Sequence, residues 1–538
     1  PLDKLLLADG HVIVDGKFYA FGEFVAVAAL MQVPENSPLR SPEQFDQIGR
    51  ERPRLDALSK STGTAEFGID AEVENLYRAV VVRSPVLGAT LQGFDASAAL
   101  KRSGVVDVVK IKSGVAVVAQ SYWQARQAAA VLELNWEKTE LGSWSSDSIY
   151  NKFNETLNDS SQKGLECCDE GEGDKLLDQS ETVVAADYYA PYLAHATMEP
   201  LNCTVAVEGD SCKIYVGTQS VQVSAGAAVY YGDFDADKVK MHPAFLGGGF
   251  GRRSLGDDVA EAVAIAKQSG RNIQLVWSRE DDMSNDFYRP AALVRMQAGV
   301  SKQGLIETWA VRRVGPNIMG HMVDAWLEVL APDYLNKGFT DWLSKLGHPL
   351  FNRFVADASN GDGIYGDYDT PNKAVRHVTQ DPGLRTGFWR SVGHSSNAFF
   401  KESFIDELAQ SAGIDELDFR LANMKNNPRL TEATQLVAAK AGWGKPLPEG
   451  HFHGLATHSS FGSAVAQIAE VSIKGTQIIV HKVTAAIHCG MVVNPEIVRD
   501  QVEGGIMYGL TAALYGEITL VDGVIQQSNF HNYPMLRM

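Results

Sequence analysis

A run of glycines constrains this sequence more than any other feature. Residues 246–254 read Leu-Gly-Gly-Gly-Phe-Gly-Arg-Arg-Ser. An apolar stretch at 239–245 predicts a strand before them, and an amphipathic stretch from Asp257 predicts a helix after them. Glycines permit positive φ and let a ligand approach the backbone closely, and N–H groups at the start of a helix suit an anion. A tight strand-to-helix turn is the alternative, and the interposed Phe250 favours the ligand loop.

Two familiar nucleotide-binding motifs do not fit this loop. A Walker loop requires Gly-Lys followed by Ser or Thr, and the stretch contains no lysine. The dinucleotide fingerprint G-x-G-x-x-G fails because Arg252 stands where the third glycine is needed, counting from Gly247. A module that binds an ordinary nucleotide through this loop stays open as an alternative function.

Length and charge limit the classes of protein that this chain can belong to. Its 538 residues allow about three or four domains at roughly 100–200 residues each. The net charge of −18 argues against a nucleic-acid partner and against docking on an anionic membrane. No apolar run approaches the roughly 18 residues of a membrane span. The composition therefore predicts an acidic multidomain enzyme without a membrane span.

Five cysteines are present, and none forms a C-x-x-C pair. A zinc ribbon or an iron–sulfur cluster held by this chain alone is therefore not expected. Cys167 and Cys168 are adjacent in an acidic stretch that contains glycine, for which a loop is the expected setting.

Changes in pattern divide the chain into five segments. Residues 1–54 contain a hairpin signal and a polar connector, and residues 55–138 alternate strands and helices as a small module. Residues 139–181 are polar and poor in pattern, which predicts a surface linker. Two larger regions with strands, glycine-rich loops and helices follow at 182–427 and 428–538. The fold class expected is a multidomain α+β protein.

Two local signals stand out in the last segment. Asn494-Pro495 predicts the start of a helix that runs to about Leu514, because Pro is favoured at the first helical position. Asp522-Gly523 lies between two strand-like runs and predicts a hairpin. A further strand is expected at Gly475–Val483.

Five separated motifs occur in order along the chain, namely His195–Thr204, Gly217–Gln219, Gly247–Ser254, Arg390–Asn397 and Asn494–Gly509. Together they resemble the molybdenum-binding subunit of the xanthine dehydrogenase/aldehyde oxidase family. Within that family they are most similar to the isoquinoline 1-oxidoreductase branch, at its β-subunit. The resemblance implies a small hammerhead-like α/β domain at 55–138. It also implies two large mixed α/β molybdopterin-binding domains at 182–427 and 428–538.

The resemblance implies a cofactor, a reaction and partners. The cofactor is a molybdopterin dinucleotide, in the cytosine form of bacterial members, and the metal is held through the pterin rather than by protein ligands. The reaction is oxidation of an aldehyde or N-heterocyclic aromatic compound with oxygen from water. Electrons pass to a separate [2Fe–2S] small subunit, with a cytochrome c as a further acceptor. The location implied is periplasmic or membrane-associated, with a cytoplasmic one left open. A scaffold that keeps the fold without molybdenum is a second alternative function.

The resemblance also implies roles for single residues. Gln219 matches the glutamine that hydrogen-bonds an oxygen ligand of molybdenum, and Phe250 matches the residue whose backbone N–H faces the metal oxo group. Arg390 and Gln501 match segments that hold the pterin or its phosphate. The cofactor-binding set is Gly248, Gly249, Phe250, Gly251, Arg252, Arg390, Ser391, Gly393, Gln501 and Gly504.

Other candidate residues receive supporting roles. Glu199 is expected to support the site by hydrogen bonding. The residues His195, His394, His488 and Cys489 are expected to be structural, since none has a second ligand at helical spacing. A group of aromatic residues suits a flat substrate ring or a core, namely Trp326, Tyr334, Phe339, Trp342, Phe351, Phe354 and the pair Phe388-Trp389.

The family's general base lies in a Gly-Glu-Pro segment near the C-terminus, and this sequence contains no such string. The nearest string, Pro448-Glu449-Gly450, lies in an expected loop. Glu517 is the other carboxylate considered, and it is expected to face solvent. The sequence is therefore expected to be a fragment shortened at both ends that supplies cofactor contacts but not the general base.

Overall fold

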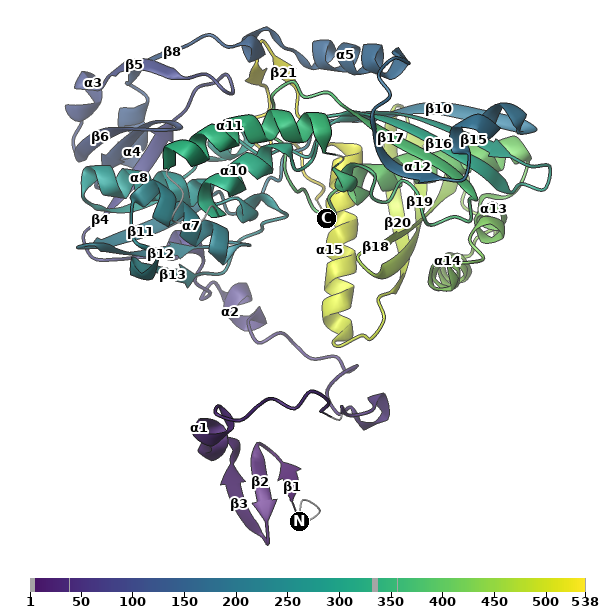
Figure 1. The fold of residues 1–538 in the computed structure, drawn as a ribbon, viewed down its shortest axis with the longest axis horizontal. Coiled ribbons are helices and arrows are strands. Elements are labelled where there is room, and N and C mark those ends of the chain that lie inside the picture. The colour runs from purple at the N-terminus through teal and green to yellow at the C-terminus, as the bar shows by residue number, and fades with distance from the viewer. Residues whose placement is uncertain (1–4, 38, 331–336, 356, 538) are drawn as a thin grey trace. The chain divides into compact units, whose positions relative to one another are not determined.

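The computed structural model describes residues 5–37, 39–330, 337–355 and 357–537. It confirms a mixed α/β architecture with several sheets (Figure 1). The chain forms two compact units, the first made of Pro1–Arg52 and Met491–Pro495, the second of Pro53–Gly490 and Glu496–Met538. Among the described residues, no helix combines the length and apolar character needed to cross a bilayer.

The first unit contains a three-stranded antiparallel sheet, in which β2 (His11–Val14) and β3 (Lys17–Ala20) form the predicted hairpin and β1 (Leu6–Ala8) adds a third strand. The short helix α1 (Val25–Ala28) follows. Positive φ at Asp15 (47°) and Gly16 (78°) gives the two-residue turn that antiparallel hairpins favour. Residues distant in sequence complete this unit, because Asn494 Nδ2 donates to Arg52 O at 2.8 Å.

A seven-stranded mixed sheet is the first layer of the second unit. In spatial order its strands are β13 (Val239–Pro243), β12 (Ser211–Val216), β11 (Asn202–Glu208), β14 (Asn272–Val276), β4 (Leu76–Val82), β7 (Gly114–Ala119) and β6 (Val105–Ile111). The strands of the predicted 55–138 module thus continue the sheet of the next region, since β4 pairs in parallel with β14.

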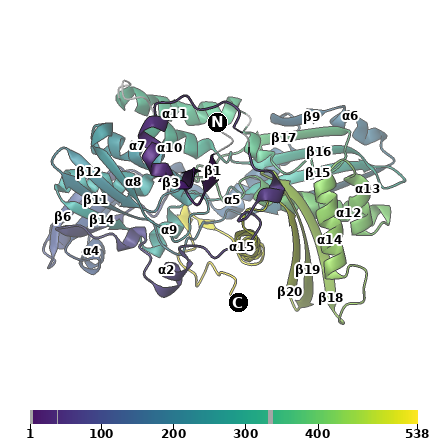
Figure 2. The same ribbon diagram turned by 90° about the horizontal axis from the view of Figure 1, so that it is seen from below.

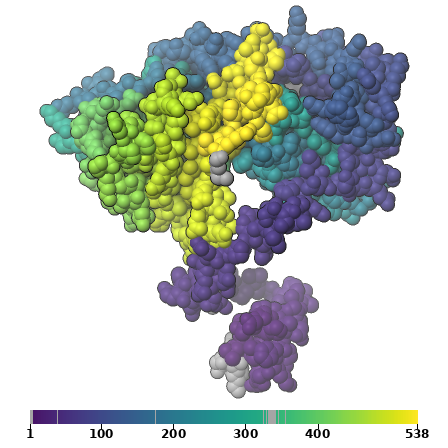
Figure 3. Space-filling model, turned by 180° about the vertical axis from the view of Figure 1, so that it is seen from behind, coloured from purple at the N-terminus to yellow at the C-terminus, as the bar shows by residue number. Residues whose placement is uncertain are grey.

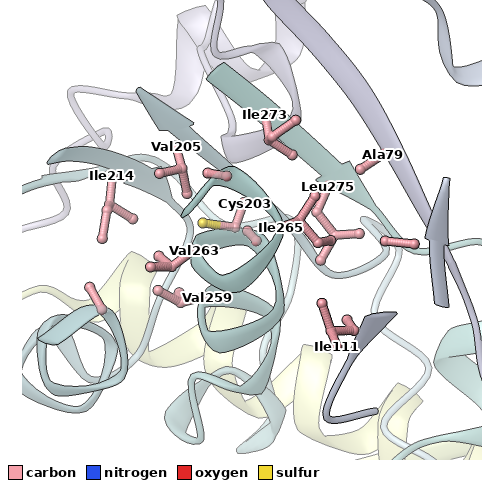
Figure 4. Close-up of a cluster of buried hydrophobic side chains, with 14 of the residues drawn as sticks. Ala79, Ile111, Cys203, Val205, Ile214, Val259, Val263, Ile265, Ile273 and Leu275 are labelled. Carbon is pink, nitrogen blue, oxygen red and sulfur yellow. The ribbon is translucent and has the colours of Figure 1, made fainter. Parts of the chain in front are cut away.

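Helices cover both faces of this sheet because successive strand residues point to opposite sides. On one face α7 (Val221–Gly232) and α8 (Asp257–Ser269) meet a core of aliphatic side chains. Figure 4 shows Val259, Val263 and Ile265 of α8 directed at the strand residues Cys203 and Leu275. On the other face lies α4 (Tyr122–Ala129), whose cap Ser121 accepts from Gln124 N–H at 3.3 Å. The short elements at this end are α2 (Ala57–Thr62), β5 (Leu91–Asp95), α3 (Ser97–Leu100) and β8 (Glu133–Trp136).

A five-stranded sheet forms the second layer. Its order is β10 (Thr182–Ala190), β15 (Ala292–Val300), β16 (Ile306–Gly315), β17 (Asn372–Thr379) and β9 (Leu165–Glu170). The long helix α12 (His394–Ala412) packs on this sheet through Phe400, Phe404 and Leu408. Helices α6 (Gly173–Leu176) and α13 (Glu416–Asn423) also belong to this part. The other helices are α9 (Arg279–Ser284), α10 (Gly320–Leu330) and α11 (Lys337–Phe354), and α10 packs against α7 and α11 (Figure 1).

The predicted linker at 139–181 has regular structure, which corrects the sequence-based expectation. It contains α5 (Ser146–Asn158), which buries Ile149, Phe153 and Leu157, and the strand β9. The spacing of these three side chains is that of one helix face, although the remaining positions are polar. Cys167 and Cys168 therefore lie on a strand rather than in a loop.

The third layer is the antiparallel sheet β18 (His451–Ser460), β19 (Ser463–Lys474) and β20 (Gln477–His488), along which α14 (Pro428–Ala441) lies (Figure 2). The strand predicted at Gly475–Val483 is shifted, because Gly475 (φ 64°) forms the turn before β20. The predicted helix is confirmed as α15 (Pro495–Leu514), part of the molecular surface in Figure 3. The Asp522-Gly523 hairpin is confirmed by β21 (Leu520–Val521) and β22 (Val524–Ile525).

Replacement of Ile265 by Ala tests the packing of α8 on the seven-stranded sheet. Ile265 is fully buried, so Ile265→Ala is expected to lower the free energy of unfolding by about 2–5 kcal/mol. Ile473 is 66% exposed on β19, and Ile473→Ala is the matched control with an expected change within about 0.5 kcal/mol. Urea unfolding followed by circular dichroism measures both. Equal effects of the two variants would contradict the packing described.

Candidate functional site

The glycine-rich loop follows β13 and reverses direction through positive φ values. Gly248 has φ 100°, Phe250 has φ 56° and Gly251 has φ 111°. A Cβ at Gly251 would lie 1.7 Å from the carbonyl oxygen of Phe388, and one at Gly249 would lie 2.4 Å from Gln219 Oε1. Gly251 requires glycine because it has positive φ and the backbone of Phe388 approaches it directly. At Gly249, by contrast, the close atoms belong to the Gln219 side chain.

Three consecutive backbone N–H groups of this loop are left for a ligand. On either side of them, Gly247 N–H donates to Glu199 Oε2 at 2.7 Å and Gly251 N–H donates to Gln219 Oε1 at 3.0 Å. Among the residues that the structure describes, the N–H groups of Gly248, Gly249 and Phe250 have no acceptor. Successive free N–H groups form a concave site for oxyanions. The loop therefore fits a cofactor that presents oxygen atoms.

Gln219 lies against the same loop. It follows β12, and its backbone N–H donates to Arg253 O at 2.9 Å. Because Gln219 Oε1 accepts from Gly251, the Nε2 amide group is the part of the side chain that can donate to a ligand. The structure thus places Gln219 against Gly249 and Gly251, the two neighbours of Phe250 in the loop.

The segment around Arg390 is held in an uncommon backbone conformation. Ser391 (φ 71°) and Val392 (φ 55°) both lie in the left-handed region, which is unfavourable for a β-branched residue. Trp389 fixes the start of the turn, because its Nε1 donates to Ala194 O at 3.2 Å. Gly393 ends it where a Cβ would lie 1.8 Å from Ser359 O. Such local strain is characteristic of functional sites.

The N-terminal half of α15 meets the Arg390 side chain. Arg390 Nη2 donates to Gln501 O at 3.3 Å. A Cβ at Gly505 would lie 3.5 Å from the same Nη2, whereas Gly504 has open space around its Cβ position. Because Gly504 and Gly505 have no side chains, the helix backbone is accessible beside the Arg390 guanidinium. This accessible backbone could contact part of a cofactor.

Comparison with known proteins agrees with this geometry. Molybdopterin cofactor-binding domains match residues 157–316 and 401–538. The chain is 30% identical over 515 residues to the beta chain of isoquinoline 1-oxidoreductase from Brevundimonas diminuta, covering 93% of this chain and 63% of that one. It is 24% identical over 565 residues to a chain of nicotinate dehydrogenase from Pseudomonas putida, covering 100% of this chain and 46% of that one. The chain belongs to the molybdopterin-binding family of the xanthine dehydrogenase and aldehyde oxidase type.

Solved structures show the same fold. Quinoline 2-oxidoreductase from Pseudomonas putida 86 superimposes with a TM-score of 0.72 at 12% identity, covering 92% of this chain and 90% of that one. CO dehydrogenase from Oligotropha carboxidovorans gives the same TM-score and coverage. The molybdopterin-binding chain described here spans 63% and 46% of the lengths of the two sequence relatives named above. The domain bounds predicted at 182–427 and 428–538 stay a prediction.

One predicted cofactor contact of this molybdopterin-binding chain is corrected by the structure. The Arg252 guanidinium is 1% exposed, donates to both carboxylate oxygens of Asp257 at 2.7 Å and forms an ion pair with Asp286 at 3.0 Å. Its side chain is therefore directed into the protein and fixes the loop to α8. Spacing in sequence could not show this, because Asp286 approaches from a distant segment.

Glu199 has the supporting role expected of it. Its carboxylate is buried and accepts from Gly247 N–H, from Ile69 N–H at 3.1 Å and from Asn202 Nδ2 at 2.8 Å. Arg253 Nη2 lies 3.2 Å from Glu199 Oε2 and completes a buried ion pair. Glu199 thereby fixes the start of the glycine-rich loop through Gly247 and its end through Arg253.

The histidines also make structural contacts. His195 Nδ1 lies 2.9 Å from Asp286, and its Nε2 lies 2.8 Å from Phe388 O. His394 Nδ1 lies 2.9 Å from His458 Nε2, and His488 Nδ1 accepts from Arg429 Nε at 2.9 Å. Within the described part of the chain, no group of three His, Cys, Asp or Glu residues could hold a metal ion.

The predicted aromatic residues are only partly brought together. Trp326 of α10 contacts Phe388 edge-on with ring centroids 5.9 Å apart, next to the glycine-rich loop. Trp342 is 55% exposed. Tyr334 and the side chains of Phe339 and Phe354 lie outside the described residues. The two carboxylates considered for the base, Glu449 and Glu517, are both exposed.

Tyr508 of α15 belongs to the site, although it was not predicted from the sequence. Its ring lies between those of Phe250 and Trp389, with centroid distances of 4.5 and 4.6 Å. The signal that could have found it is its spacing from Gln501, Gly504 and Gly505, which places all four on one side of a helix.

Replacement of Glu199 by Gln tests the support beneath the loop. The variant places an NH2 group among N–H donors and leaves Arg253 buried without its charge partner, so we expect the free energy of unfolding to fall by about 3–5 kcal/mol. Thermal unfolding measures the loss. Glu517→Gln at an exposed position is the control and should leave stability unchanged. An equally small effect of Glu199→Gln would show that the buried pair does not form.

A buried carboxyl beside the loop predicts a dependence of stability on pH. Burial, followed by the charge of Asp257, raises the pKa of Asp258 from 3.8 to about 7. The native protein therefore binds this proton more tightly than the unfolded chain does, so the contribution of Asp258 to stability is lost as pH rises through that interval.

We expect Asp258→Asn to raise the melting temperature relative to the unaltered protein at pH 8, and to do so much less at pH 5, because the amide does not titrate. Asp147 occupies the same second position of α5 but is exposed, so Asp147→Asn is the matched control and should act equally at both pH values. Thermal unfolding of both variants and of the unaltered protein at pH 5 and pH 8 measures these differences in melting temperature. A pH-independent effect of Asp258→Asn would contradict the raised pKa.

Proposed function

We propose that this chain binds a molybdopterin dinucleotide in its cytosine form and oxidises an N-heterocyclic aromatic compound or an aldehyde with oxygen derived from water. The convergence of three segments carries the proposal: the free N–H groups at 248–250, the Arg390 turn and the glycine face of α15. The names of the sequence relatives, isoquinoline 1-oxidoreductase and nicotinate dehydrogenase, support a heterocyclic substrate.

The residues of this chain would bind and orient the cofactor. When bound, the cofactor supplies the redox centre and activates water, as metal centres do by lowering its pKa. The N–H groups of Gly248, Gly249 and Phe250 would donate to its oxygen atoms, and Gln219 Nε2 would donate to another. A neutral amide suits that place because it donates without adding charge.

The Arg390 turn and α15 would hold the remainder of the cofactor. The guanidinium of Arg390 presents a fork of donors that matches phosphate geometry. Ser391 and Gly393 set the turn that presents it, while Gln501 and Gly504 line the bare face of the helix. The general base is not assigned to a residue of this chain. The contact of Trp326 with Phe388 would form one wall for a flat substrate ring.

Partners and location follow from the same resemblance. Electrons would pass to a separate [2Fe–2S] small subunit and from there to an acceptor such as a cytochrome c. A periplasmic or membrane-associated site is proposed, and a relative named membrane-bound aldehyde dehydrogenase of Gluconacetobacter polyoxogenes is 26% identical to this chain. A cytoplasmic site stays open.

Cofactor analysis of protein purified from its native host tests the function. We expect about one molybdenum per chain and release of cytidine monophosphate on acid hydrolysis, with iron only in preparations that retain the small subunit. A different nucleotide without molybdenum would support an ordinary nucleotide-binding module. Neither metal nor nucleotide would support a scaffold that lacks the cofactor.

Replacement of Gln219 separates its two functions as donor and acceptor. Gln219→Ala removes both, and Gln219→Glu keeps the acceptor for Gly251 N–H but removes the amide donor. If the donor acts on the cofactor, both variants should lower kcat by about 100- to 1000-fold, a loss of roughly 2.7–4 kcal/mol. Steady-state kinetics on molybdenum-normalised enzyme measures this. Gln222→Ala, at an exposed position on α7, is the control, and full activity of Gln219→Glu would exclude the donor role.

A further inference from the structure

Three aromatic rings from three separate segments form a continuous stack at the candidate site. Phe250 belongs to the glycine-rich loop, Trp389 to the Arg390 turn and Tyr508 to α15. The planes of Phe250 and Tyr508 meet at 25° with centroids 4.5 Å apart, and those of Tyr508 and Trp389 at 21° with centroids 4.6 Å apart. These are favourable offset-stacking distances. Tyr508 is the middle ring.

One outer ring belongs to a residue with a demanding backbone conformation, and the other lies next to two such residues in the chain. Phe250 has φ 56°, and its ring would lie 3.1 Å from a Cβ at Gly248, so the ring is enclosed between Gly248 and Tyr508. Trp389 precedes the left-handed pair Ser391 and Val392. Residues in such conformations persist only where surrounding contacts determine them. The middle ring supplies such a contact to both.

Tyr508 makes two further contacts in the same region. Its hydroxyl donates to the carbonyl oxygen of His195 at 3.1 Å. The Arg390 guanidinium carbon lies 5.8 Å from the centroid of its ring, within the range of a cation–π interaction. One side chain of α15 thus touches the glycine-rich loop, the Arg390 turn and the segment at His195.

We propose that Tyr508 is a positioning residue that sets the direction of the Phe250 N–H group and of the Arg390 guanidinium toward the cofactor. The inference rests on the proposed function, since it concerns the same site. Stacking on Tyr508 and the close approach of Gly248 fix the ring plane of Phe250 and, through its Cα, the peptide group before it. The hydroxyl fixes the rotation of Tyr508 itself. Loss of the ring should loosen both loops together, whereas loss of the hydroxyl alone should leave the stack in place.

Four variants test this assignment. Tyr508→Leu removes the middle ring and keeps a residue with high helix propensity. Tyr508→Phe keeps the stack and removes the hydroxyl. Phe250→Leu removes the stacking contact with Tyr508 by changing the loop residue instead, and it keeps the backbone N–H group at position 250. This variant still tests the proposal if Tyr508→Leu does not fold. Tyr188→Leu is the matched control, because Tyr188 is also half-buried and stacks on Phe400 at 6.3 Å away from this site.

Two readouts are measured on protein from the native host grown with and without molybdate. Amide hydrogen exchange at residues 247–251 and 389–392 in molybdate-free protein reports the loops directly. We expect it to rise about tenfold in Tyr508→Leu and Phe250→Leu and to stay near the unaltered value in Tyr508→Phe and Tyr188→Leu. Molybdenum per chain in molybdate-grown protein should fall about tenfold in the same two variants only.

The outcomes separate the two proposals. Unchanged exchange in Tyr508→Leu and Phe250→Leu would overturn the positioning role. Faster exchange with molybdenum retained as in Tyr188→Leu would overturn it as well, because the loops would then move without consequence for the cofactor. Absence of molybdenum from the unaltered protein would overturn the proposed function and this inference with it. A molybdenum loss confined to the two ring variants supports both.

Discussion

The buried carboxylate of Glu199 is the interaction on which the candidate site depends. It accepts from Gly247 at the start of the glycine-rich loop, from the backbone at Ile69 and from the guanidinium of Arg253. Arg253 in turn donates to Gly248 O at 2.9 Å and to Glu199 O at 2.7 Å. A buried ion pair is stable only when its remaining donors and acceptors are also hydrogen-bonded. This requirement fixes the positions of both side chains. Hydrogen bonds from Gly247 N–H and Gly251 N–H thus hold the loop on either side of its three free N–H groups.

A second chain of polar contacts connects the loop to the Arg390 turn. Arg252 binds Asp286, Asp286 binds His195, and His195 reaches the carbonyl oxygen of Phe388. Burial alone would raise the pKa of Asp286, but the neighbouring charges of His195 and Arg252 outweigh burial and lower it. The carboxylate of Asp286 thus stays charged where it lies, between His195 and Arg252. The glycine-rich loop and the Arg390 turn are thus held both by these polar contacts and by aromatic stacking.

Local signals in the sequence predict those parts of the fold that neighbouring residues determine. The turn at Asp522-Gly523, the helix that begins at Pro495 and the glycine-rich loop all follow from residue types at adjacent positions. Five motifs placed Gln219, Phe250, Arg390 and Gln501 in one family pattern. In the structure Gln219 contacts the loop that contains Phe250, and Arg390 contacts Gln501.

The remainder was not predictable because partners distant in sequence determine it. The parallel pairing of β4 with β14 has no local signature, and the two carboxylates that enclose Arg252 come from different segments. Tyr508 looks like an ordinary core residue until Phe250 and Trp389 are seen on its two faces. Helix α5 was concealed by its polar residues, although Ile149, Phe153 and Leu157 recur every four positions.

The pairing of β4 with β14 has a consequence for how the chain is made. β4 and β7 are rich in valine, and the open edge of β4 faces solvent until residues 272–276 have been synthesised. An unpaired apolar edge is a template for wrong strand pairing, and non-local pairing slows folding. The first unit must wait longer still, because its contact between Arg52 and Asn494 spans 442 residues. The seven-stranded sheet therefore stays incomplete at the β4 edge until β14 (Asn272–Val276) has left the ribosome.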